Sequence, residues 1–375
     1  MIFLDNASTT KIKDEIISEI EKSCQLFFNP SAVYSKSLET KNLVTNAKEK
    51  ICKALGTTFN DNLITTGSAT EANNLAIFGS ARKTSAQYIF SKGEHPSVHN
   101  CALELKNRGY NVVFVGLNQN GEVDLDELGK LLNNETCFVS IMHVSNETGA
   151  INDIQKIVKL VKSKQKNAVV HCDGVQAFGK IPTNVTNLGV DFYTISAHKL
   201  GGPKGIGALY VKDIKKLKPI IYGGGQEFGL RSGTENVQFI LAFGKLCENL
   251  NINENFEKVS KLRKYIFEFF ADKKDISINS TIQGSPYITS LSFEGVRGET
   301  LVHMLEEDDI LLGTGSACSS KKGALNRTLE AMGKSKIQNE GAIRISFCPT
   351  NSLEEIEFAC KKICEKFICL KEKLR

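Results

Sequence analysis

Near the middle of the chain the sequence reads Ser196-Ala197-His198-Lys199-Leu200-Gly201-Gly202-Pro203-Lys204-Gly205-Ile206-Gly207. Apolar, β-forming residue types precede and follow this stretch, which predicts a buried strand on each side of a Gly-rich turn. Such glycines let the backbone come close to a bulky group. A desolvated lysine beside other cationic groups forms Schiff bases readily, and Lys199 has the setting for this chemistry. A surface lysine in a Gly-rich hairpin explains the same residues, and this stretch alone does not decide between the two readings.

Short strands alternate with helices through the first two thirds of the chain. The predicted strands cover 63–65, 87–91, 111–115, 136–143, 168–172, 191–195 and 206–211. Two predicted helices over 13–28 and 37–55 precede them, and helices of ten or more residues lie between most of the strands. This alternation is typical of an α/β fold with a mainly parallel sheet.

The pattern changes near residue 251. A charged helix over 256–271 is followed by two short strands, 288–293 and 343–347, and by helices over 299–306 and 353–370. This order indicates a smaller α+β domain. The sequence therefore predicts a large domain over 13–250 and a small domain formed by 1–12 and 251–375.

Composition excludes several classes of function. Among 375 residues the net charge is only +5, and no basic block carries interleaved aromatic residues, so direct nucleic-acid binding has no support. No apolar run reaches the length of a membrane span, and the first residues lack the pattern of a secretion signal, which predicts a cytoplasmic protein. The eleven cysteines are scattered without a Cys-x-x-Cys pair, so we expect reduced thiols and no metal site.

Polar side chains follow the predicted strands, where ligands of such sheets bind. Ala69 and Thr70 open a helix whose N-terminus favours phosphate, although a plain helix cap explains the same residues. Asp173 suits an ion pair with a pyridinium nitrogen, or else caps the next segment, and His95 suits a stacked acid/base, or else caps a helix before its proline. Together with Lys199 these residues favour pyridoxal phosphate as the cofactor.

A cysteine near the end of the chain stands apart from the others. Cys318 lies among small residues, with Lys321 and Lys322 close behind it. An open, electropositive setting of this kind favours the thiolate, the nucleophilic form. The role of a buried packing cysteine fits Cys52, Cys137 or Cys247 better.

The ordered set of motifs resembles the cysteine desulfurases of the NifS/IscS type, within the class V aminotransferase superfamily. The matching stretches include Leu4-Asp5-Asn6-Ala7, Asn29-Pro30-Ser31, Ala69-Thr70-Glu71, Glu94-His95, Asn146-Glu147-Thr148-Gly149, His171-Cys172-Asp173, Ser196-Ala197-His198-Lys199, Arg231-Ser232-Gly233-Thr234, Gly315-Ser316-Ala317-Cys318 and Arg344-Ile345-Ser346. The resemblance runs nearly end to end. It implies the fold of type I pyridoxal-phosphate transferases, with a mainly parallel seven-stranded sheet in the large domain.

The resemblance also implies roles for individual residues. Lys199 would be the Schiff-base lysine and His95 a stacked acid/base. Asp173 would pair with the pyridine nitrogen, and Gln176 would bond the phenolic oxygen. The remaining cofactor-binding residues would be Ala69, Thr70, Asn146, Ser196 and His198, joined by Thr234, which would reach the phosphate of the partner subunit in a homodimer.

For the reaction, the resemblance implies conversion of L-cysteine to L-alanine. Asn146 and Arg344 would bind the substrate carboxylate, which the guanidinium fork matches bidentately. Cys318, carried by the small domain, would be the nucleophile and hold a persulfide for a protein acceptor, either an iron–sulfur scaffold or a tRNA-thiolating enzyme. A selenocysteine lyase or another class V aminotransferase remains the alternative.

Overall fold

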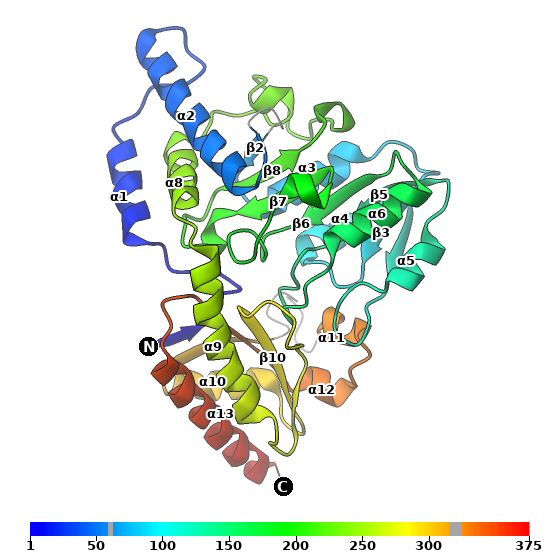
Figure 1. The fold of residues 1–375 in the computed structure, drawn as a ribbon, viewed down its shortest axis with the longest axis vertical. Helices are drawn as coiled ribbons and strands as arrows, with labels where there is room; N and C mark the ends of the chain where they lie inside the picture. Colours follow the sequence, from blue (N-terminus) through cyan, green and yellow to red (C-terminus); the bar gives the residue numbers. More distant parts are fainter. Residues whose placement is uncertain (59–62, 315–324, 375) are drawn as a thin grey trace.

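The computed structural model describes residues 1–58, 63–314 and 325–374. Two sheets lie in two parts of the chain, one above the other in Figure 1. Their strand orders are β2-β8-β7-β6-β5-β3-β4 and β1-β11-β12-β10-β9. The long helix α9 (Ile252–Phe270) leads from the upper part to the lower one.

The seven-stranded sheet confirms the predicted mainly parallel α/β fold. Strands β3 to β7 run parallel to one another, whereas β8 pairs antiparallel with both β2 and β7. The bounds are β2 (Leu63–Thr66), β3 (Gln87–Ser91), β4 (Asn111–Val115), β5 (Thr136–Ser140), β6 (Val169–Asp173), β7 (Phe192–Ser196) and β8 (Gly207–Val211).

Helices cover this sheet and join its strands. They are α3 (Ala69–Ser80), α4 (Pro96–Asn107), α5 (Leu125–Leu131), α6 (Ile154–Lys164), α7 (Val185–Leu188) and α8 (Val237–Glu248). Two helices from the start of the chain, α1 (Asp14–Ser23) and α2 (Ser35–Ala54), pack against α8 at one side of this part (Figure 1).

The five-stranded sheet combines the start of the chain with its last third. Its strands are β1 (Ile2–Leu4), β9 (Ile276–Ile278), β10 (Ile288–Phe293), β11 (Ile310–Thr314) and β12 (Ala342–Ser346), accompanied by α10 (Gly298–Glu306), α11 (Arg327–Ala331), α12 (Lys336–Glu340) and α13 (Leu353–Lys373). Leu4 and Ala7 lie in the same apolar core as α9 and α13. The division into domains 13–250 and 1–12 with 251–375 stays a prediction.

Helix α1 is shorter than the apolar spacing predicts, because it ends at Ser23 instead of Phe28. The side-chain amide of Gln238, on α8, donates to the carbonyls of Ser23 and Leu26. A tertiary contact therefore takes the backbone acceptors that a continued helix would have used.

A buried ion pair anchors the Gly-rich loop that precedes α8. Lys48, on α2, donates to the Glu227 carboxylate at 2.6 Å, and Thr65 bonds the same carboxylate. Glu227 and Phe228 have positive φ angles of 50° and 60°. Residues with side chains hold this conformation only where their surroundings impose it, and we attribute it here to the buried pair.

Removing the cation of this pair is expected to destabilise the protein strongly. Lys48→Met leaves the Glu227 carboxylate buried without its cation, so the free energy of unfolding should fall by about 3–5 kcal/mol. Urea denaturation of the cofactor-loaded protein measures the change. The control is Lys50→Met, whose pair with Glu248 is largely exposed and should contribute below about 1 kcal/mol. Equal effects of the two variants would contradict the anchoring role.

Candidate active site

The candidate site lies at the carboxyl ends of β6 and β7, which are parallel neighbours in the larger sheet. Asp173 is the last residue of β6, and Ser196 is the last residue of β7. A single 3-10 turn after β7, η2 (Ala197–Lys199), carries His198 and Lys199. The sheet therefore brings these predicted residues to one edge.

The N-terminus of α3 meets the same edge. Ser68 caps the helix by accepting from the backbone N–H of Glu71, so Ala69 and Thr70 form its first turn, whose N–H groups have no acceptor within the helix. Gly207, which pairs with Ser196, lies so close that an added Cβ would be 2.7 Å from the Ala69 nitrogen. The absence of a side chain at Gly207 lets the N-terminal end of α3 reach the sheet.

Asp173 is linked to His95 by a short chain of hydrogen bonds. Asn73 donates to the Asp173 carboxylate and to the Ser97 hydroxyl, at 2.8 Å each. That hydroxyl lies 2.8 Å from Nδ1 of His95, which caps α4. Asn73 and Ser97 were not predicted from the sequence. The one signal for Asn73 is an amide among the mostly apolar residues of the buried face of α3.

His95 is surrounded by charges from both parts of the chain. Burial lowers its pKa, the charges of Lys199, Arg327 and Arg344 lower it further, and Asp173 opposes them. The imidazole is therefore neutral near pH 7, the form that can accept a proton. Burial and the nearby lysines likewise lower the pKa of His198 to about 4.

Lys199 and Gln176 share one acceptor. The amine of Lys199 donates to the carbonyl oxygens of Ala7 and Ser8, at 2.7 and 2.6 Å. The side-chain nitrogen of Gln176 donates to the same Ala7 oxygen at 2.8 Å. The start of the chain therefore passes directly beside Lys199, which no local sequence pattern predicts.

Arg344, on β12, is held by acidic and carbonyl oxygens. One nitrogen lies 2.7 Å from the Asp5 carboxylate, and the other donates to the Asn146 carbonyl at 3.0 Å and lies 3.7 Å from Glu147. The Asn146 side chain donates to Glu147 at 2.6 Å. Asp5 and Glu147 orient the guanidinium of Arg344. These two contacts were not predicted from the sequence, because both residues lie far from Arg344 along the chain.

Two side chains tie the start of α11 to the site. Asn326 donates to the Glu147 carboxylate at 2.7 Å, and Arg327 donates to the Glu94 carbonyl at 2.8 Å. Cys318, the predicted nucleophile, lies outside the described residues. The start of α11 is bonded both to Glu147, which lies beside Arg344, and to Glu94, the residue before His95.

Thr234 lies apart from the other predicted residues. It is exposed in the loop between Gly233 and α8. The neighbouring Gly233 N–H donates to the side chain of Gln226, which belongs to the loop anchored by Glu227. Among the described residues, no hydrogen bond links this threonine to Asp173 or His95.

The residues present fit pyridoxal phosphate. Asp173 is buried, accepts from Asn73 and from the Val175 N–H, and has no cationic partner within 4.0 Å among the described residues. A pyridinium nitrogen would supply that cation. Lys199 supplies the amine that the aldehyde needs, while the end of α3 with Ser196 and His198 suits the phosphate.

Among the residues that the structure describes, no group of acidic, histidine and cysteine side chains could hold a metal ion. No helix in the same part of the chain is long and apolar enough to cross a membrane.

The fold and the donor set define a pyridoxal-phosphate enzyme of fold type I. The profile of the family Aminotransferase class-V matches residues 2–358. The cysteine desulfurase IscS of Dictyoglomus turgidum is 35% identical, with 100% of this chain and 95% of that protein covered. A solved NifS-like protein superposes with a TM-score of 0.92 at 33% identity, covering 98% of this chain and 100% of the other. SspA in complex with cysteine superposes with a TM-score of 0.83 at 28% identity, covering 94% and 100%.

The chain belongs to the class V aminotransferase family, and within it to the cysteine desulfurases of the NifS/IscS type. Enzymes of this family depend on pyridoxal phosphate, in agreement with the donor set at the edge of the larger sheet.

Proposed function

We propose that this enzyme converts L-cysteine to L-alanine and transfers the sulfur atom to Cys318 as a persulfide. One observation carries the proposal: hydrogen bonds through Asn73 and Ser97 link the Asp173 carboxylate to His95, at the sheet edge where the turn after β7 carries Lys199. A relative solved with bound cysteine has the same fold, which supports the choice of substrate.

Each residue has a separate task in this proposal. Arg344 binds the substrate carboxylate, and Asp5 and the Asn146 carbonyl keep its guanidinium oriented. The bound cofactor supplies an electron sink at the substrate Cα. Lys199 takes the Cα proton, and neutral His95 accepts and returns protons near the substrate sulfur.

The sulfur transfer balances without an added oxidant or reductant. The thiolate of Cys318 attacks the substrate sulfur, the Cβ–S bond breaks, and an S–S bond forms on the enzyme. The carbon skeleton gains protons at Cβ and Cα and leaves as alanine. The acceptor of the persulfide is then a protein, an iron–sulfur scaffold or a tRNA-thiolating enzyme, in the cytoplasm.

Product analysis tests this proposal. Protein incubated with L-cysteine and excess thiol should release alanine and sulfide in equal amounts. Without added thiol, Cys318 should gain the mass of one sulfur atom. If the product were a keto acid instead of alanine, the result would support the aminotransferase alternative. If only selenocysteine were turned over, the result would support the selenocysteine lyase alternative.

A homodimer is the second part of the proposal. The loop that carries Thr234 also exposes apolar side chains, with Tyr222 81% and Phe228 51% exposed. Exposed aromatic residues beside a buried anchor such as Glu227 are typical of a contact surface. Thr234 of one protomer would then bind the phosphate at the other protomer's site.

Dimerisation and cofactor affinity should therefore be linked by mass action. Tyr222→Glu, which places a charge in the proposed contact, should shift the protein towards monomer and weaken cofactor binding by roughly tenfold. Sedimentation velocity and cofactor titration measure the two effects. Ile337→Glu is the control, because this exposed residue lies on α12 beside the smaller sheet. A monomer that holds the cofactor as tightly as the wild type would refute the link.

A further inference from the structure

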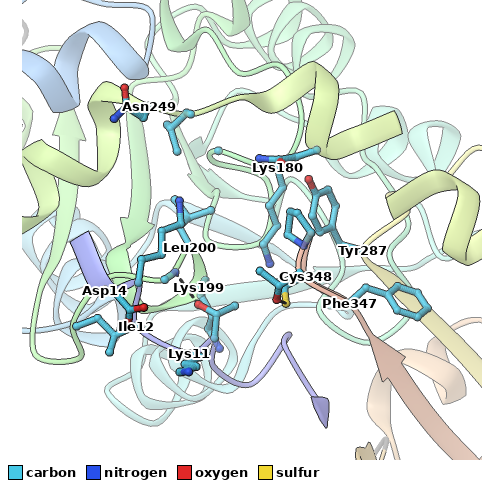
Figure 2. Close-up of a pocket in the computed structure, with 18 residues that line it drawn as sticks. Lys11, Ile12, Asp14, Lys180, Lys199, Leu200, Asn249, Tyr287, Phe347 and Cys348 are labelled. Atoms are coloured by element: carbon cyan, nitrogen blue, oxygen red, sulfur yellow. Dashed lines mark hydrogen bonds between the residues drawn. The ribbon is translucent and has the colours of Figure 1, made fainter. Parts of the chain in front are cut away.

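Lys180 is a buried lysine that neither the predicted site nor the proposed reaction uses. Only 4% of its surface is exposed. Its amine lies over the ring of Tyr287, 5.6 Å from the centre of that ring. Figure 2 shows Lys180 and Tyr287 together, with Cys348 nearby. A buried charged amine is costly, so its retention calls for a specific partner.

That partner is Gln176, four residues earlier in the turn segment that follows β6. The amine of Lys180 donates to the side-chain oxygen of Gln176 at 2.9 Å. A protonated amine only donates, so the carboxamide must turn its oxygen towards Lys180. Its nitrogen consequently faces the opposite way, where it donates to the Ala7 carbonyl beside the amine of Lys199.

In the described part of the chain, the Lys180 amine donates to the side-chain oxygen of Gln176. The other groups near this amine affect its pKa. Burial lowers the pKa of Lys180 to about 7, Lys199 and Arg344 act in the same direction, and Cys348 opposes them. A cavity of about 260 Å³ reaches Lys180 and is bordered by Tyr287, Cys348 and Lys199, with Lys11 and Lys13 at its wall. Either protonation state of the Lys180 amine keeps an N–H to donate to Gln176.

We propose that Lys180 is a positioning residue of the cofactor site: it fixes the Gln176 carboxamide so that its N–H points at the group bound to Lys199. The inference rests on the proposed role of Gln176 as donor to the phenolic oxygen of the cofactor. Without Lys180 the amide is free to flip and to present its oxygen, which repels another oxygen.

A double-mutant cycle on cofactor binding tests this role. Apoprotein is titrated with pyridoxal phosphate, and the growth of the visible band gives the dissociation constant. Lys180→Met should weaken binding by roughly five- to tenfold, about the size of one hydrogen bond. In the Gln176→Ala background the same substitution should cost less than about twofold, because the amide it positions is absent. Equal losses in both backgrounds would overturn the proposal, since they indicate a structural role.

Three further variants sharpen the result. Lys180→Arg keeps the donors, and the adjoining cavity has room for the guanidinium, so at least half of the lost affinity should return. Gln176→Glu keeps an oxygen acceptor for Lys180 but has no side-chain N–H, so this variant should lose as much cofactor affinity as Lys180→Met. Wild-type affinity of Gln176→Glu would refute the proposal, and this test holds even if Lys180→Met fails to fold. Lys11→Met removes a charge from the same cavity without touching Gln176 and should bind normally.

The readout involves no sulfur chemistry. If the persulfide mechanism on Cys318 were wrong, sulfide release would fail while the cycle between Lys180 and Gln176 kept its result.

Discussion

Lys199→Ala is expected to abolish the visible absorbance of the bound cofactor and to lower the rate of cysteine turnover by roughly 10³-fold or more. Lys199 follows β7 directly, and its amine is held beside Gln176 by the carbonyls of Ala7 and Ser8. The loss should therefore be chemical, since the amine that bonds the aldehyde is absent. Absorption spectra of purified, cofactor-saturated protein measure it.

Lys204→Ala is the matched control for this experiment. Lys204 lies in the same Gly-rich turn but is exposed, so its removal should leave the absorbance band unchanged. If Lys204→Ala lost the band and Lys199→Ala kept it, the assignment of the two lysines would be wrong.

Cys318→Ala should separate cofactor binding from sulfur transfer. The variant should keep the visible band and still change its spectrum on adding cysteine, because Asp173, Lys199 and Arg344 are intact. Sulfide release should fall on the order of 10³-fold or more, since no thiolate is present to attack the substrate sulfur. Spectra and sulfide assays on the same sample provide both readouts.

Cys348→Ala is the control thiol. Its sulfur lies 2.9 Å from the Thr350 hydroxyl, in the cavity beside Lys180. We expect most of the activity to remain, because this thiol follows β12 and has a local partner. Full sulfide release by Cys318→Ala would exclude Cys318 as the nucleophile and favour the lyase or aminotransferase alternatives.

Strong local patterns located most of the larger sheet. The predicted strands over 87–91 and 111–115 agree with β3 and β4 residue for residue, and those over 168–172 and 191–195 differ from β6 and β7 by one position. Continuous apolar runs identify buried parallel strands because both faces of such strands are covered. The smaller sheet was harder: β1 and β9 have three residues each, too few for a recognisable period.

The residue types at the carboxyl ends of the strands were informative for the site. Asp173 and Ser196 end β6 and β7, Lys199 lies in the turn after β7, and His95 caps α4, as their sequence positions suggested. Parallel strands place their carboxyl ends along one edge, so polar residues at several ends converge without any knowledge of their contacts.

Which side chains touch depends on pairings between distant parts of the chain. Asn73 reaches Asp173 across 100 positions, Asp5 reaches Arg344 across 339, and the Ala7 carbonyl meets Lys199 across 192. The fold class and the chemical types of the site were thus readable from periodicity and residue identity, which are local properties. The partners that orient Asp173, Arg344 and Gln176 follow from how helices and loops pack over the sheet, because hydrogen bonds form between whichever groups that packing brings within 3 Å.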